Sequence, residues 1–302
     1  MFGSNFFKFL FVLLASVLLV ACNEQSAPKA AQEKTVGATQ KTFSVKGVIQ
    51  ELKPDGKTVV IKHEEIPNYM KAMTMPFEVK DAKELSGLKA GDAISFRMIV
   101  TEKEGWIDHV SKLNKAPEEM PSRETFRVAR AVEPLKVGDL LPEYHFTNEL
   151  GQTVSLSQCK GQAIALTFIF TACPFPNFCP KMSSNFAEAA KKLNEMPNGP
   201  RNWHLFSISF DPENDTPTRL KSYAEAQHYD SQRWSFLTGD LIDVTAITEQ
   251  FGQQFWRDGT SISHNLRTVV IDARGRVQKI IPENKWTSDE LVQELVKAAA
   301  AR

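Results

Sequence analysis

Residues 163–171 read AIALTFIFT, and residues 172–181, which follow directly, read ACPFPNFCPK. The first segment is apolar almost without interruption, which predicts a strand buried on both faces in the centre of a sheet. Pro180 suits the first turn of a helix, where its missing N–H costs nothing, and we expect that helix over residues 181–193. Cys173 and Cys179 therefore lie in a loop between a central strand and a helix.

Strands and helices alternate on both sides of this segment. We expect further strands over residues 203–210 and 235–237, helices over 216–228, 244–251 and 287–300, and a hairpin over 268–281. A parallel core that ends in a hairpin and a terminal helix is the thioredoxin-like order. The sequence thus predicts an α/β thioredoxin-like domain over residues 135–302.

The preceding segment, residues 42–114, has a different pattern of short strands separated by Gly and Pro turns. The expected strands are residues 43–49, 58–61, 75–79, 93–100 and 106–110. Five short strands predict a small all-β, OB-like barrel. Residues 115–134 carry charges and three prolines, which indicates a linker.

The N-terminal residues are typical of export. Residues 9–20 form an apolar run broken only by small residues. At its end, Leu19-Val20-Ala21-Cys22 resembles the lipobox of bacterial lipoproteins. That resemblance implies a signal peptide over residues 1–21 and a lipid on Cys22. A retained membrane helix or an ordinary signal peptide is the alternative, although the run is short of the roughly 20 residues that span a bilayer.

A lipid on Cys22 would place the protein in the cell envelope, facing the periplasm, on an inner or an outer membrane. Residues 22–41 contain almost no large apolar side chain, which predicts a flexible tether. The chain has 36 Lys and Arg against 36 Asp and Glu, so charge gives no reason to expect a nucleic-acid partner. Four cysteines are too few for a disulfide scaffold.

Two groups of soft donors stand out. The first contains Cys173, Cys179 and the distant His264. Thiolate and imidazole suit Cu(I), and the positive end of the following helix favours a thiolate at Cys179. A structural disulfide or a redox-active dithiol remains an alternative for the two cysteines. Cys159 lies in the turn before the central strand, and we expect a free or buried thiol there.

The second group contains His63, Met70, Met73 and Met75. Met73 and Met75 begin a predicted strand, so their thioethers point to the same face. His63 ends the preceding strand, and the two positions can meet across neighbouring strands. Thioethers and imidazole bind soft Cu(I) without releasing protons, whereas the competing interpretation is that the methionines only fill the core.

Three motifs resemble the Sco/SenC family. They are residues 168–174 with 179–182, the segment SISFDPENDTP at 207–217, and SHNLRT at 263–268. The resemblance covers about residue 135 to the C-terminus. It implies copper ligands at Cys173, Cys179 and His264, and a role in assembling the copper site of a respiratory oxidase. Five residues separate the cysteines here, where the family usually has three. Asp211 either orients His264 or forms a turn, and Asp215 or Thr216 is expected to cap the next helix.

The barrel segment resembles the periplasmic CusF type of copper-binding domain. The resemblance implies a second copper site at His63, Met73 and Met75. The prototype of that family stacks a Trp over the metal, and this segment has none before its Met pair. Either Met70 adds a third thioether or Tyr69 takes the aromatic place, and Trp106 is not assigned.

These features together predict a lipid-anchored copper metallochaperone that handles Cu(I), with Cu(II) as a second state. The barrel would collect the ion and pass it to the thioredoxin-like domain, and an oxidase subunit or another copper protein would be the client. A thiol-disulfide oxidoreductase is the main alternative. Copper buffering or resistance, and a peroxidase, are the others.

Overall fold

The computed structural model describes residues 40–114, 132–258 and 261–301. All of them belong to one compact unit, residues 38–302. The predicted signal peptide, Cys22, nearly all of the predicted tether and most of the predicted linker lie outside the described residues. Among the residues described, no helix combines the length and apolar character needed to cross a membrane.

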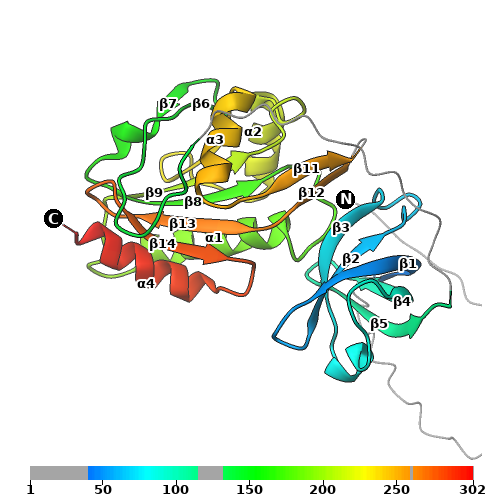
Figure 1. The fold of residues 1–302 in the computed structure, drawn as a ribbon. Helices are drawn as coiled ribbons and strands as arrows, with labels where there is room; N and C mark the ends of the chain where they lie inside the picture. Colours follow the sequence, from blue (N-terminus) through cyan, green and yellow to red (C-terminus); the bar gives the residue numbers. More distant parts are fainter. Residues whose placement is uncertain (1–39, 115–131, 259–260, 302) are drawn as a thin grey trace, which may run out of the picture. The chain divides into compact units, whose positions relative to one another are not determined.

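The first part of the unit is a five-stranded antiparallel sheet in the order β3-β2-β1-β4-β5 (Figure 1). Its strands are β1 (Lys41–Leu52), β2 (Thr58–His63), β3 (Met73–Glu78), β4 (Ala93–Val100) and β5 (Gly105–Lys112), with a short 3-10 helix η1 (Ala82–Leu85) between β3 and β4. A bridge between Val79 and Ile107 joins the two outer strands and closes the sheet into a small barrel. The predicted all-β first domain is confirmed.

Alternation of side chains produces this barrel. In β3 every second residue is buried, beginning with Met73, so Met75 and Phe77 share the inner face. β2 pairs with β3 in a register that places His63 opposite Met73 and Ile61 opposite Met75. The end of β2 and the start of β3 therefore bring imidazole and thioether side chains to one end of the barrel.

The second part is a seven-stranded mixed sheet in the order β14-β13-β8-β9-β10-β6-β7. Its strands are β6 (His145–Asn148), β7 (Thr153–Ser155), β8 (Ala163–Ile169), β9 (Trp203–Ser209), β10 (Trp234–Thr238), β13 (Arg267–Ile271) and β14 (Val277–Pro282). The strands β8, β9 and β10 run parallel, and β13 pairs with β8 in the antiparallel sense. All seven residues of β8 are buried, as the continuous apolar run predicts.

Four α-helices flank this sheet: α1 (Cys179–Glu195), α2 (Pro217–Ala226), α3 (Leu241–Gln250) and α4 (Ser288–Ala299). The helices α1 and α4 pack together on one face, and α3 lies on the other (Figure 1). A short 3-10 helix η2 (Leu156–Cys159) precedes β8. This arrangement confirms the predicted thioredoxin-like domain.

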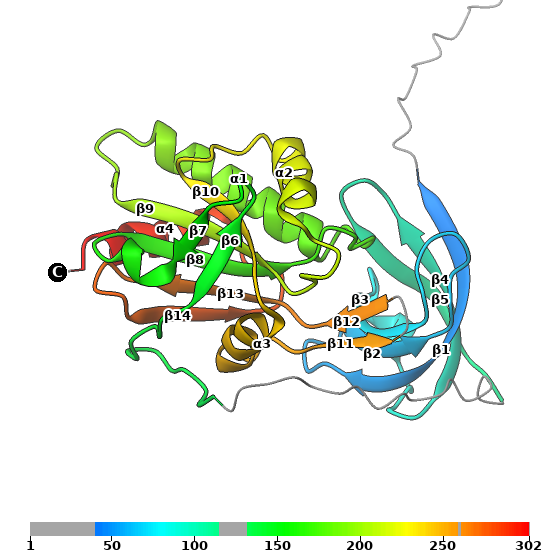
Figure 2. The ribbon, with the colours of Figure 1, turned by 90° about the horizontal axis from the view of Figure 1, so that it is seen from above.

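A second, two-stranded sheet was absent from the predicted elements. It is formed by β11 (Phe255–Asp258) and β12 (Ser261–His264), which pair in the antiparallel sense (Figure 2). The strand β12 contacts β3, where the Thr74 backbone N–H donates to Ser263 Oγ at 3.1 Å. This hairpin therefore carries His264 to the barrel strand that holds Met73 and Met75.

Candidate metal centre

The loop that follows β8 is held by a buried carboxylate. Thr171 donates its backbone N–H and its hydroxyl to Asp215 at 2.9 and 2.5 Å, and Ser209 Oγ donates to the same carboxylate at 2.6 Å. Asp215 is fully buried, so it fixes the start of the loop against the end of β9. We expected a cap of α2 at Asp215 or Thr216, and the cap is Thr216, whose hydroxyl accepts from the Arg219 N–H.

The three predicted ligands of this domain lie together. The sulfurs of Cys173 and Cys179 and a ring nitrogen of His264 all lie within 4.8 Å of one another. Metal–sulfur bonds of about 2.3 Å place neighbouring ligand atoms roughly 4 Å apart. The three donors therefore fit one ion after a small contraction. Cys179 is the first residue of α1 and is fully buried, whereas Cys173 is partly exposed.

His264 is oriented for binding through its Nε2 atom. Its Nδ1 lies 2.7 Å from the Asn265 carbonyl, and because a carbonyl can only accept, Nδ1 carries the proton. The Nε2 lone pair is then free and faces Cys179 Sγ at 3.9 Å. The rings of Phe170, Phe178 and Phe210 surround the imidazole with centroid distances of 5.5, 5.4 and 4.9 Å. A carbonyl partner on the distal nitrogen is the usual support of a metal-binding histidine.

The two cysteines differ in their readiness to ionise. Burial opposes ionisation of Cys173, but the interactions of its sulfur with the Cys179 thiol and the His264 ring outweigh it and hold the pKa of Cys173 well below its ordinary value. Burial and the adjacent Cys173 sulfur raise the pKa of Cys179 well above the ordinary value. The position of Cys179 at the start of a helix predicts a thiolate there, and this prediction is wrong. Burial and the neighbouring Cys173 sulfur raise the pKa of Cys179 by more than the helix terminus lowers it.

The second predicted group lies on the inner face of the barrel. His63 is fully buried, and Met70, Met73 and Met75 are buried as well. His63 Nδ1 donates to the Glu64 carbonyl at 2.7 Å, and its Nε2 has no hydrogen-bond partner among the described residues. Burial lowers the pKa of His63 to about 4, so the imidazole is neutral at pH 7. A buried, neutral and unpartnered Nε2 beside thioethers suits a soft metal ion.

The structure shows where Tyr69, Trp106 and Met70 lie relative to the barrel group. Tyr69 stacks on Phe43 with ring centroids 4.6 Å apart, and its hydroxyl donates to the Pro174 carbonyl at 2.9 Å. Trp106 lies beneath the Lys80 ammonium, 4.5 Å from the ring centroid. Of the possible third donors, Met70 and not Tyr69 lines the cavity that the other two methionines share.

Five of these donors face the same small cavity, whereas His63 and Cys179 are not among the residues that line it. Its volume is about 20 Å³. It is lined by Met70, Met73, Met75, Phe170, Cys173, Pro174, Phe175, Phe178, Ile262, Ser263 and His264. A cavity of this size holds about one atom-sized occupant. The sequence predicted two separate sites, and the structure brings three thioethers, a thiol and an imidazole to one space.

Asp211 does not contact His264. Its carboxylate accepts from the Asn214 amide at 2.9 Å and pairs with the Arg257 guanidinium on β11. The expected turn is confirmed, because the Asp211 carbonyl accepts from the backbone N–H groups of Asn214 and Asp215 at 3.0 and 2.8 Å. Its carboxylate in addition anchors the hairpin that carries His264. Cys159 is a free, partly buried thiol far from these donors in the chain, and burial raises its pKa to about 11.

The hairpin of β11 and β12 was the main element missed by sequence reasoning. One signal was present, because Asp258-Gly259 is a frequent hairpin dipeptide. For Asp215 the sequence predicts only a helix cap. Only the fold shows that its carboxylate reaches Thr171.

Two family models match this chain. Residues 133–300 match the SCO1/SenC family, and residues 42–112 match the copper binding periplasmic protein CusF. Both resemblances stated from the sequence are therefore confirmed. The two models meet at the cavity, because its methionines lie in the second match and its cysteine and histidine lie in the first.

Curated relatives and solved structures are similar to the C-terminal part. The SCO1 protein homolog of Bacillus subtilis is 38% identical over 96 residues, which are 32% of this chain and 47% of that protein. The SCO2-like protein of Rickettsia felis is 25% identical over 149 residues, which are 45% of this chain and 66% of that protein. The chain thus spans less than two thirds of either relative. A SCO1/SenC family lipoprotein from Bacillus anthracis is 26% identical, with a TM-score of 0.48, over 54% of this chain and 95% of that one.

Proposed function

The chain belongs to the SCO1/SenC family, and we propose that it is a membrane-anchored metallochaperone that delivers copper to a copper centre of a respiratory oxidase. The observation that carries the proposal is the cluster of Cys173, Cys179 and His264, whose donor atoms lie within 4.8 Å of one another. Sulfur and imidazole donors of this kind favour Cu(I). Copper is the cargo in this proposal, and the protein returns unchanged after delivery.

The barrel supplies the first binding site in the proposed route. His63, Met73 and Met75 would capture Cu(I), with Met70 as a further thioether. Thiolates bind Cu(I) more tightly than thioethers, so the ion would move downhill to Cys173 and Cys179. The match of residues 42–112 to a copper-binding periplasmic family supports this role for the barrel. It also supports a location in the cell envelope on the periplasmic side. In this proposal a lipid on Cys22 is the anchor.

The test is an anaerobic Cu(I) titration of the reduced, intact chain against a chromogenic chelator. We expect Cys173→Ser and His264→Ala each to weaken the tightest Cu(I) site by at least about 100-fold, because each removes a direct ligand. Cys159→Ser is the matched control and retains wild-type affinity. Wild-type affinity in both ligand variants would overturn the proposal. Loaded protein is then mixed with an apo copper domain of an oxidase subunit, which should gain the copper.

One observation favours a second candidate function. Cys173 and Cys179 are free thiols close enough to react with each other, and Cys173 has the lowered pKa of a nucleophile. A thiol-disulfide reductase would use this pair to reduce a disulfide in an exported protein, becoming a disulfide itself. Replacing His264 separates the two functions, because a reductase keeps most of its dithiol exchange without this histidine. A chaperone loses its tight copper site in the same variant.

A further inference from the structure

The five residues between the copper cysteines make several contacts with the barrel. Asn177 forms two hydrogen bonds with the backbone of Gly105, accepting from its N–H at 3.0 Å and donating to its carbonyl at 2.7 Å. The Pro174 carbonyl accepts from the Tyr69 hydroxyl. Phe175 packs edge-on against Phe77 with ring centroids 5.9 Å apart. Each of these contacts joins the loop to a different barrel segment.

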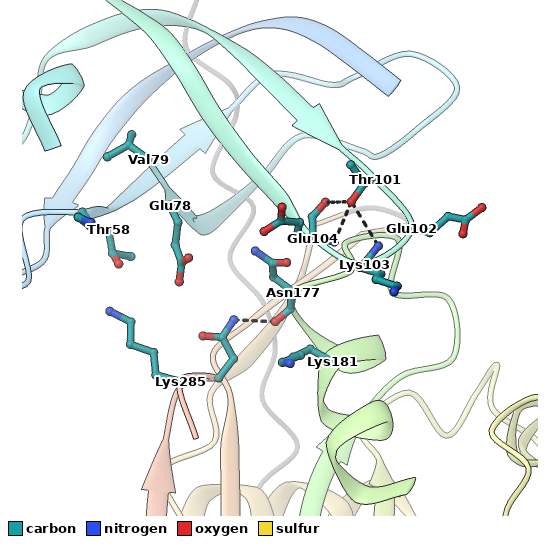
Figure 3. Close-up of a pocket in the computed structure, with 12 residues that line it drawn as sticks. Thr58, Glu78, Val79, Thr101, Glu102, Lys103, Glu104, Asn177, Lys181 and Lys285 are labelled. Carbon is teal, nitrogen blue, oxygen red and sulfur yellow. Dashed lines mark hydrogen bonds between the residues drawn. The ribbon is translucent and has the colours of Figure 1, made fainter. Parts of the chain in front are cut away.

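The barrel is shaped to receive this loop. A Cβ atom at Gly105 would lie 2.5 Å from the Phe175 ring, so only glycine lets the ring approach β5. The Asn284 amide donates to the Asn177 carbonyl at 2.7 Å and steadies the loop from its own domain. Figure 3 shows the Asn177 side chain pointing toward the barrel segment that holds Thr101 and Glu104. Lys285 pairs with Asp55 of the barrel beside this contact. The longer loop between the cysteines thus supplies residues that bind the barrel.

Docking places the thioethers over the cysteine site. Met70, Met73 and Met75 line the 20 Å³ cavity from the barrel side, and Cys173 and His264 line it from the other. The Thr74 N–H to Ser263 Oγ hydrogen bond aligns β3 with β12 between them. A larger pocket of about 460 Å³ shares Met70 and Met73 with this cavity and opens toward solvent. Met70 and Met73 therefore lie between the cavity and this outer pocket.

We propose that the loop over residues 174–178 is a docking element that completes one composite copper site, in which barrel thioethers and the ligands Cys173, Cys179 and His264 bind the same Cu(I) ion. This inference rests on the proposed function and specifies how copper is handed over. The ion stays Cu(I) throughout. A Cu–thioether bond breaks as each Cu–thiolate bond forms, and the proton of a binding thiol leaves to solvent. The ion is never released between the domains.

The experiment uses the intact chain with every methionine replaced by selenomethionine, loaded with one Cu(I) per chain under anaerobic conditions. X-ray absorption at the copper edge reports the thiolate sulfurs, and absorption at the selenium edge reports any selenium bonded to copper. We expect both signals at one equivalent. The selenium–copper signal should disappear in the Met70→Leu/Met73→Leu/Met75→Leu variant, which assigns it to the barrel.

Two variants of the contact between loop and barrel, one on each side, test the docking element. Asn177→Ala removes both hydrogen bonds to Gly105, and Gly105→Ala pushes the Phe175 ring away. Both should lose the selenium–copper signal and keep the copper–thiolate signal. Asn202→Ala is the matched control, because its amide also donates to backbone carbonyls, those of Gly161 and Ala299, but away from the barrel. It should keep both signals.

The outcomes separate the two proposals. A copper–thiolate signal without selenium scattering in the wild type, with a second Cu(I) needed to produce it, would mean two independent sites and would overturn the composite site. The chaperone proposal would survive that result. Absence of copper–thiolate scattering in the wild type would instead overturn the proposed function. Selenium scattering that persists in both Asn177→Ala and Gly105→Ala would show that the loop is not needed to bring the methionines to the ion.

Discussion

Asp215 shows how one buried carboxylate positions a ligand that it does not touch. It accepts three hydrogen bonds from Thr171 and Ser209, and Thr171 stands two residues before Cys173. Because the carboxylate is fully buried, its replacement leaves donors without a charged acceptor. Sequence reasoning found Cys173 by its chemistry, but this support depends on two strand ends that only the fold brings together.

We expect Asp215→Asn to lower the free energy of unfolding by about 1–3 kcal/mol, since charge-assisted hydrogen bonds in the interior are lost. Cu(I) affinity at Cys173 should fall by about ten-fold, as outer partners of ligands commonly contribute. Urea unfolding and Cu(I) competition measure the two effects. Asp211→Asn, which alters the pair with Arg257, is the comparison. Reduced stability with unchanged copper affinity would limit Asp215 to folding.

His204 gives the copper-free protein a predictable dependence on pH. Burial, aided by the charge of Arg233, lowers the pKa of His204 from 6.5 to about 4. As pH falls, the imidazole of the unfolded chain therefore takes up a proton before the native one does. The contribution of His204 to the free energy of unfolding is complete above about pH 6.5 and is lost as pH falls toward 4. Between pH 7 and 5 we expect a loss of about 1–2 kcal/mol.

Urea midpoints at several pH values test this sign, with His204→Gln as the variant. The slope between pH 7 and 5 should fall by about half in the variant, because His63 has a similarly lowered pKa and keeps its own share. A variant with the wild-type slope would show that the native His204 imidazole titrates normally. A free energy of unfolding that rises as pH falls would contradict the direction itself.

The strands and helices follow the sequence pattern closely where burial is periodic or continuous. All residues of β8 are buried, and β4 has the predicted bounds, Ala93–Val100. The helix α1 begins two residues earlier than expected, at Cys179, because Pro180 occupies its first turn and not the position before it. The short strands β6, β7, β11 and β12 escaped prediction, since four or fewer residues give too little periodicity to detect.

Gly47 on β1 tests how tightly the barrel sheet is packed. A Cβ atom there would lie 2.5 Å from Ile61 Cγ2 and 2.7 Å from the Lys62 carbonyl on β2. Because a backbone oxygen cannot move aside cheaply, we expect Gly47→Ala to destabilise the protein by about 1–3 kcal/mol. Thermal unfolding measures it, and Ser44→Ala on the exposed face of β1 is the control. Equal stability of both variants would mean that β1 and β2 separate easily.

The two groups of soft donors could be identified in the sequence, whereas the meeting of five of them at one cavity could not. Cysteine, histidine and methionine reveal soft-metal chemistry wherever they occur in short motifs. Their convergence on one cavity depends on Asn177, Phe175 and Gly105, which are ordinary residues with no metal chemistry. The two unusual features, a longer cysteine spacing and a missing Trp, were interpreted separately. In the structure the longer loop contacts the barrel through Asn177, and Tyr69, which precedes the Met pair, contacts the loop through its hydroxyl.

A composite site makes copper a link between the stabilities of both domains. A ligand whose free concentration is about 100 times its dissociation constant stabilises the folded protein by about 2.7 kcal/mol. A ligand shared by two domains stabilises both of them. Scanning calorimetry of the intact chain should therefore show the barrel and the thioredoxin-like domain unfolding together at a raised temperature with one Cu(I). In Asn177→Ala the barrel should unfold separately at its copper-free temperature, while Asn202→Ala behaves as wild type. If one Cu(I) raised the temperature of the thioredoxin-like domain alone in the wild type, the ion would be bound by Cys173, Cys179 and His264 without the methionines.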